Sequence, residues 1–210
     1  MWGTDRCGEA VRPARIHRRQ NFWLDLFACF IIPAYTLLFA GSVEWFGTNF
    51  SVIAVTGKDH YWGFVYWGVL AGGYFAVMLT KLALILPQLR QRMAVCLLTL
   101  LACLALGYAL AIPYLPDDFP GFASLHVLLA AGACVLLMLA LLLVLLFLYR
   151  RGPERYRHLL VRWGLIAGGS GLLFLLAGMV SSALEVYFTI TTALLTRRIW
   201  LTACDGMEKF

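Results

Sequence analysis

The stretch GLIAGGSGLLFLLAGMVSSALEVYFTITTALLT, residues 164–196, gives the clearest indication of the fold. Steps of alternately four and three residues from Gly164 follow one helical face, and nine of its ten positions lack a large apolar side chain. Bulky apolar residues flank this face, so the pattern predicts a membrane helix that other helices approach closely. We call it the small-residue face; it consists of Gly164, Gly168, Gly171, Leu175, Gly178, Ser182, Glu185, Thr189, Thr192 and Thr196.

The composition of the chain is that of an integral membrane protein. Apolar residues make up 62% of its 210 residues and charged residues only 13%, about half the charged share of a soluble domain. Four further apolar runs, at about 21–42, 61–86, 93–113 and 122–149, each reach the roughly 20 residues needed to cross a bilayer. We therefore expect an all-α, polytopic transmembrane helix bundle with five spans, the fifth of them a long helix. A soluble catalytic domain is excluded.

The apolar runs also set the domain organisation. Residues 1–20 form a basic cytoplasmic tail, 21–200 a single transmembrane helix-bundle domain, and 201–210 a C-terminal tail. The last run, from Arg162 to Arg197, is longer than one crossing needs. The unbroken small-residue face, with no proline or glycine pair near Ser182, favours one straight helix. The alternative is a hairpin that turns near 181–185, gives six segments and returns the C-terminal basic residues to the cytoplasm.

The basic residues are distributed unevenly. Thirteen of the 17 lysines and arginines lie in the N-terminal tail and on alternate connections, as the positive-inside rule describes. This distribution predicts a cytoplasmic N-terminus in a multi-pass cell-membrane protein and no nucleic-acid partner. The Leu- and Ala-rich composition is typical of a bacterial inner membrane protein. The fourth connection is expected either to serve as a topological anchor or to bind anionic lipid, at about 1 kcal/mol per arginine, through Arg150, Arg151, Arg155 and Arg157.

No motif of a reactive site is found in the sequence. The six cysteines form no C-x-x-C pair and are interpreted as small packing residues, and neither G-x-S-x-G nor H-E-x-x-H occurs. We therefore expect no catalytic motif, no metal site and no cofactor.

Two glycine motifs predict close helix packing. One is Gly68-x-x-x-Gly72 and the other is Gly164-x-x-x-Gly168, which Gly171 and Gly178 extend along the small-residue face. Such motifs let two helix backbones approach each other. The contact lies either within one chain or across a homodimer or larger membrane complex, and both alternatives stay open.

Two charged residues fall inside the apolar runs near the cytoplasmic border. Asp25 lies about one turn into the first span, and Lys81 lies near the end of the second. Antiparallel packing would bring the two to one level as an ion pair. The alternative is that each reaches the membrane surface separately.

A polar vestibule is predicted at the outer face. Glu185 is 22 residues beyond Trp163, roughly 33 Å along a helix and thus at the far boundary of the hydrocarbon. His126 enters its span at that same boundary, and the first outer connection, about 43–60, lies on that side. The vestibule would comprise Glu185, His126, Asn49, His60 and Ser182. The alternative is that Glu185 only reaches outer water and the connection lies on the membrane surface.

Three short segments carry a resemblance to other proteins. They are Thr48-Asn-Phe-Ser-Val-Ile, the aromatic run Tyr61-Trp-Gly-Phe with Trp67-Gly, and Ser182-Ala-Leu-Glu-Val-Tyr-Phe. Through these segments about a quarter of the chain resembles a group of small uncharacterised bacterial multi-pass membrane proteins. The resemblance implies the fold and the compartment and carries no activity.

Two hypotheses of function follow from these features. In the first, the protein is a non-enzymatic membrane component that binds or passes a small or amphiphilic molecule, or acts as an accessory subunit. In the second, it is an intramembrane enzyme that acts on lipid with Glu185 and His126 as its acid/base pair. A bundle without any ligand is the structural alternative to both.

Overall fold

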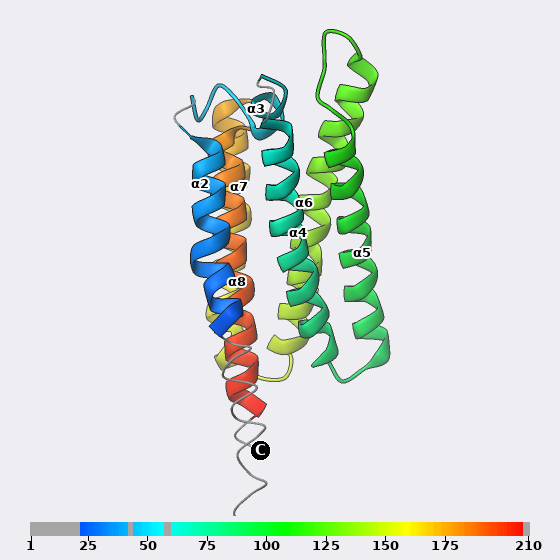
Figure 1. The fold of residues 1–210 in the computed structure, drawn as a ribbon. Coiled ribbons are helices and arrows are strands. Elements are labelled where there is room, and N and C mark those ends of the chain that lie inside the picture. The colour runs from blue at the N-terminus through cyan, green and yellow to red at the C-terminus, as the bar shows by residue number, and fades with distance from the viewer. Residues whose placement is uncertain (1–21, 42–43, 57–59, 208–210) are drawn as a thin grey trace, which may run out of the picture.

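The computed structural model describes residues 22–41, 44–56 and 60–207, and in this part of the chain every regular element is a helix. The elements pack into one bundle with the short helix α3 across one end (Figure 1). They are the π-helical turn η1 (Phe27–Ile31), α2 (Ile32–Ala40), α3 (Phe50–Thr56), α4 (His60–Leu84), α5 (Leu89–Ala111), α6 (Pro120–Tyr149), α7 (Pro153–Ala177) and α8 (Ser182–Met207).

The long apolar runs become the long helices of this bundle. Five helices are long and apolar enough to cross a membrane, namely Phe22–Ala40, α4, α5, α6 and α7. This confirms the prediction of an all-α bundle, and the protein is a multi-pass membrane protein. We call its two ends the α3 end and the basic end. The basic end carries the α4–α5 and α6–α7 connections (Figure 1), with Arg90, Arg92, Arg150 and Arg151 in or beside them.

The expected straight C-terminal helix is wrong, and the hairpin alternative is the one observed. Helix α7 ends at Ala177, and Gly178, at φ +67°, donates its N–H to the carbonyl of Phe174 at 2.9 Å. Helix α8 begins at Ser182 and runs back beside α7 (Figure 1). A single helix over 162–197 would be roughly 54 Å long, far more than the roughly 30 Å of a hydrocarbon core.

The hairpin divides the small-residue face into two halves with different surroundings. On α8 its serine and threonines are buried, with Ser182, Thr192 and Thr196 fully inaccessible and Thr189 nearly so, and Glu185 is half-buried. On α7, by contrast, a Cβ built on Gly164, Gly168, Gly171 or Gly178 would meet no atom within 4 Å. The α8 half therefore faces the bundle interior, and the α7 half faces outward.

The other glycine motif packs within the chain. A Cβ built on Gly68 would lie 2.5 Å from Cδ1 of Leu110, and one on Gly72 would lie 2.7 Å from Cδ2 of Leu106. These two leucines project from α5 into the space that the glycines leave on α4. Gly68 and Gly72 therefore pack within one chain, whereas packing of the α7 glycines between chains stays a prediction.

The apolar core lies where α4, α6 and α8 meet, and most of it belongs to the half of the bundle towards the basic end. Its fully buried large side chains include Met78, Leu79 and Leu82 of α4, Leu141 and Leu145 of α6, and Ile199 of α8. Helices in lipid associate through such close packing, since lipid and core are equally apolar. Among the described residues, helix α8 carries more of the buried polar and charged side chains than any other helix, and its neighbours shield them.

Candidate ligand site at the α3 end

The first connection is attached to the start of α8 by backbone hydrogen bonds. The Ala183 N–H donates to the carbonyl of Trp45 at 2.9 Å, and the Ser182 N–H donates to that of Thr48 at 2.7 Å. The Ser182 hydroxyl donates to the same Thr48 carbonyl at 3.1 Å. The first N–H groups of a helix have no partner within it, so the connection satisfies these donors and is fixed over the bundle.

Glu185 extends this attachment to α3. Its Oε2 accepts the N–H of Phe50 at 2.7 Å, so a carboxylate of α8 satisfies a first-turn donor of α3. Its Oε1 makes no hydrogen bond within the part of the chain that the structure describes. The Asn49 Oδ1 accepts the N–H of Val52 at 2.9 Å, which is the bond that an N-cap residue makes.

His126 connects three elements at the same end. Its Nε2 lies 2.7 Å from the Ser51 Oγ of α3, and its Nδ1 lies 2.7 Å from the carbonyl of Ile112, which follows α5. A carbonyl only accepts, so Nδ1 carries a proton, and in the neutral ring Nε2 accepts a hydrogen bond from the Ser51 hydroxyl. His126 is 2% exposed and Ser51 8% exposed.

The apolar side of α3 is embedded among aromatic rings. Phe50 is fully buried, with its ring centroid 5.1 Å from that of Phe39 and 4.9 Å from that of Trp67. The Trp67 Nε1 donates to the buried hydroxyl of Thr36 at 3.1 Å, which links α4 to α2. These contacts hold α3 rigidly above the bundle core.

Two cavities lie close to these groups. The first is an apolar cavity of about 70 Å³ between α4, α5, α6 and α8. Its lining includes Trp67 and also Phe188, which lies one helical turn after Glu185 on α8. The second is a groove of about 380 Å³ under the α5–α6 connection, lined by residues that include Tyr114, Ala123 and Val127. The Tyr114 ring centroid lies 5.8 Å from that of His126.

Four of the five residues predicted for the vestibule meet at this end. Glu185, Ser182, His126 and Asn49 all contact or belong to residues 48–52. His60 lies exposed at the first residue of α4 and forms no hydrogen bond with them in the described part of the chain. Glu185 and His126 are linked through the consecutive residues Phe50 and Ser51 and form no hydrogen bond with each other. Ligand binding by this group stays a prediction.

Ser51 is the residue that sequence reasoning missed. It was part of an interfacial connection with no expected partner. A signal was present in the pattern Asn49-Phe50-Ser51, in which a capping residue precedes a large aromatic anchor and a hydroxyl. A short docked helix puts the side chains of Phe50 and Ser51 into the bundle.

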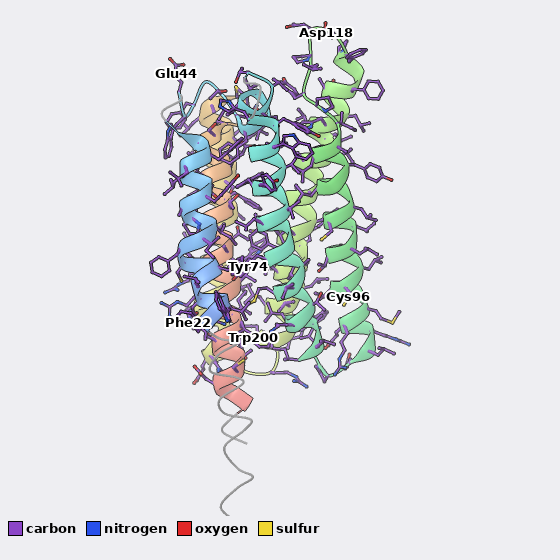
Figure 2. The ribbon with its side chains drawn as sticks, in the orientation of Figure 1. Phe22, Glu44, Tyr74, Cys96, Asp118 and Trp200 are labelled. Atoms are coloured by element: carbon purple, nitrogen blue, oxygen red, sulfur yellow. The ribbon has the colours of Figure 1, made fainter. Side chains whose placement is uncertain are left out.

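The basic end holds a second polar cluster, with partners other than those predicted. Asp25 Oδ1 accepts from the Arg197 Nε of α8 at 2.5 Å in place of the expected Lys81. The Lys81 Nζ lies 5.5 Å from the centroid of the Trp200 ring, and Figure 2 shows Trp200 and Phe22 toward this end. The reason is the hairpin, which returns α8 between these helices and buries Arg197 at 2% exposure.

The arginines expected to meet anionic lipid divide into two groups. The Arg155 Nη2 donates to the carbonyl of Thr202, so this side chain fastens α7 to the end of α8. Arg150, Arg151 and Arg157 are exposed at the basic end. Contact of these three with lipid headgroups stays a prediction.

Neither a metal centre nor a relative supplies a function for this site. Among the described residues, no group of three His, Cys, Asp or Glu side chains is placed to hold a metal ion. Comparison with known proteins finds no match among family models, curated proteins or solved structures.

Proposed function

We propose that this protein is a membrane component that binds an amphiphilic molecule at the α3 end, with Glu185 receiving a cationic or hydrogen-bond-donating head group. The observation that carries the proposal is the state of the Glu185 carboxylate. Its Oε2 is fixed by the Phe50 N–H, and its Oε1 has no hydrogen-bond partner among the described residues. An ionisable group on an inward face of a membrane protein usually has a partner.

The apolar cavity next to Glu185 supports an amphiphile over a purely polar ligand. Phe188, one turn after Glu185 on α8, lines the cavity together with Trp67, Gly68 and Gly72 of α4. Its volume of about 70 Å³ holds about two water-sized groups, so it accepts a short segment of an alkyl chain. The rest of such a chain would stay in the surrounding lipid, which suits a ligand that enters sideways from the bilayer.

The same proposal includes an orientation and a compartment. The α3 end faces the outside of a bacterial plasma membrane, and the N-terminus is cytoplasmic. The arginines of the α4–α5 and α6–α7 connections lie at the opposite end, and the hairpin brings Arg198 to that end as well, in accord with the positive-inside rule. Arg150, Arg151 and Arg157 are then positioned to contact anionic lipid of the inner leaflet.

A photoreactive probe tests the binding. The full chain in lipid nanodiscs is irradiated with a long-chain alkyl amine that carries a diazirine, and in parallel with the carboxylic acid of the same chain. We expect the amine to label the protein near α8, and Glu185→Gln to lower this labelling by about tenfold, the effect of about 1.4 kcal/mol. Glu44→Gln is the matched control, since Glu44 is an exposed carboxylate at the same end (Figure 2).

The opposite result is equally clear. Labelling of equal strength by the amine and the acid, unchanged in Glu185→Gln, contradicts a carboxylate-selected head group. Labelling that falls equally in Glu44→Gln and Glu185→Gln shows only a general surface attraction for the amine and also contradicts the proposal.

One observation favours the accessory-subunit form of the proposal, in which α7 contacts a second membrane helix in a homodimer or larger complex. Only 11% of the apolar 18-residue stretch of α7 is buried, against 44% of the corresponding stretch of α4. Gly164, Gly168 and Gly171 of α7 face open space. A cysteine at Gly168 is expected to form a disulfide-linked dimer on mild oxidation in membranes, and one at Gly73, open but on α4, is the control. Equal crosslinking at both positions contradicts a specific α7 contact.

A further inference from the structure

The contact between Ser51 and His126 has the geometry of an activated nucleophile. The two side chains come from α3 and α6, 75 positions apart in sequence, and their Oγ and Nε2 atoms lie 2.7 Å apart in a buried position. A serine in the first turn of a helix commonly caps a backbone N–H. Here Asn49 makes that bond with Val52, so the Ser51 hydroxyl is directed to the imidazole.

The imidazole is held in the tautomer that a general base requires. Ile112 lies just beyond α5, and its carbonyl is the group that His126 Nδ1 reaches at 2.7 Å. Because Nδ1–H donates to this carbonyl, the lone pair of Nε2 points at Ser51. A nucleophile, a base in hydrogen-bond contact and a third group that orients the base are the parts that serine acyl-transfer sites share.

A groove that could hold a substrate is next to the imidazole through Tyr114, which lines the groove and contacts the His126 ring. The groove of about 380 Å³ has Tyr114 and Ala123 in its wall, and its volume falls within the usual range for small-molecule sites. The centroid of the Tyr114 ring lies 5.8 Å from that of the imidazole, and the centroid of the Phe64 ring lies 6.3 Å from it. The groove is lined by both polar and apolar atoms at the end of the bundle, which suits an ester that joins an acyl chain to a polar alcohol.

From this geometry we infer that Ser51 and His126 hydrolyse an acyl ester of an amphiphile, with Ser51 as nucleophile and His126 as general base. The inference rests on the proposed function only in taking a membrane amphiphile as the substrate class. The Ser51 Oγ attacks the ester carbonyl carbon while its proton passes to His126 Nε2. The bond between the carbonyl carbon and the alkoxy oxygen then breaks, and the alcohol leaves with that proton.

The second half of the reaction restores the site. Water attacks the acyl-Ser51 ester, gives one proton to His126 Nε2, and forms the carboxylic acid as the bond to Oγ breaks. His126 returns its proton to Ser51, so the sum is ester plus water to acid plus alcohol, with no oxidant or reductant. Glu185 acts as a positioning residue, because its bond to the Phe50 N–H fixes the residue next to Ser51.

A covalent probe tests the nucleophile directly. The full chain in nanodiscs is treated with a long-chain alkyl fluorophosphonate, and the adduct is located by mass spectrometry. We expect the adduct on Ser51, none in Ser51→Ala, and at least about a 100-fold slower reaction in His126→Gln, the usual contribution of a general base. Ser170→Ala is the matched control, since Ser170 lies on α7, outside the groove and away from the Ser51–His126 contact.

Ester turnover is measured on the same samples with p-nitrophenyl decanoate, and a Ser51→Cys variant guards against a folding defect. Cysteine has the shape of serine with a slightly larger terminal atom, so in a folded variant the new thiol should react with a long-chain iodoacetamide. Absence of an adduct on wild-type Ser51, or equal ester turnover in wild type and Ser51→Ala, overturns the inference. If Ser51 is not a nucleophile, the amine probe should still label the protein. If the amphiphile does not bind at Glu185, the fluorophosphonate should still form its adduct with Ser51.

Discussion

Replacing Glu185 by alanine removes the acceptor of the Phe50 N–H, and the structure gives a magnitude for the effect. The lost bond is 2.7 Å long and has a carboxylate as acceptor, and hydrogen bonds to charged groups contribute about 1.5–3 kcal/mol. At about 1.4 kcal/mol per tenfold change, local opening of α3 should become about 10- to 150-fold more frequent. The hydrogen bonds from Ser182 and Ala183 to the connection remain, so the bundle itself should stay folded.

Hydrogen exchange measured by mass spectrometry checks this value. Peptides that cover 49–56 should lose about 10- to 150-fold in protection in Glu185→Ala, while peptides from α5 and α6 keep theirs. Glu185→Gln retains an uncharged acceptor and should lose roughly half as much free energy. Unchanged protection over 49–56 in Glu185→Ala, or an equal loss in Glu44→Ala, would refute the reasoning that this one carboxylate fastens α3.

Two further predictions follow from the packing and from the hairpin. Gly68→Ala should lower the free energy of unfolding by about 1–3 kcal/mol, because its Cβ would collide with a leucine of α5. Gly168→Ala is the control: its Cβ enters open space, so it should be neutral or stabilising by up to about 1 kcal/mol. A denaturant titration measures both, and equal effects of the two substitutions would contradict the packing. Single cysteines at Arg151 and Asp205 should react with a membrane-impermeant thiol reagent from the same side of the membrane, and one at Asp118 from the other; labelling of Asp205 together with Asp118 would contradict the hairpin.

The spans could be predicted from sequence because the bilayer imposes a length and a polarity on each of them. The predicted runs at 61–86 and 122–149 became α4, His60–Leu84, and α6, Pro120–Tyr149, with ends displaced by a few residues. Helix α6 begins earlier than predicted because Pro120 is tolerated in the first turn of a helix. Hydropathy alone does not identify α8 as a separate helix of the bundle, because its sequence is too polar. Neighbouring helices shield its polar residues from lipid.

The hairpin could have been predicted from local chemistry. Gly178 is in the left-handed conformation typical of a residue just past a helix, and Ser182-Ala-Leu-Glu185 has the spacing of a capping box. In the structure Glu185 reaches across to Phe50 of α3, and the Ser182 hydroxyl reaches across to Thr48. Continuity of the small-residue face misled the prediction, since two antiparallel helices can each carry half of a periodic pattern.

The partners of charged residues were beyond sequence reasoning for a different reason. Asp25 pairs with Arg197, a residue that the straight helix placed on the far side of the membrane. Once the direction of α8 is known, this pairing follows from the level of the two residues in the bundle. The expectation of a straight C-terminal helix therefore also led to the wrong partner for Asp25 at the basic end.

The long sequence separation of the contacts made by α8 has a consequence for biosynthesis. The bond from Glu185 to Phe50 spans 135 positions, and the bond from Arg197 to Asp25 spans 172. A chain emerges from the ribosome with its N-terminal parts first, so α2 to α7 enter the membrane before α8 brings Glu185 and Arg197 to their partners. Until α8 is inserted, the Asp25 carboxylate has no arginine partner and α3 has no carboxylate at its first turn. Helix α8 is therefore the element that completes both ends of the bundle.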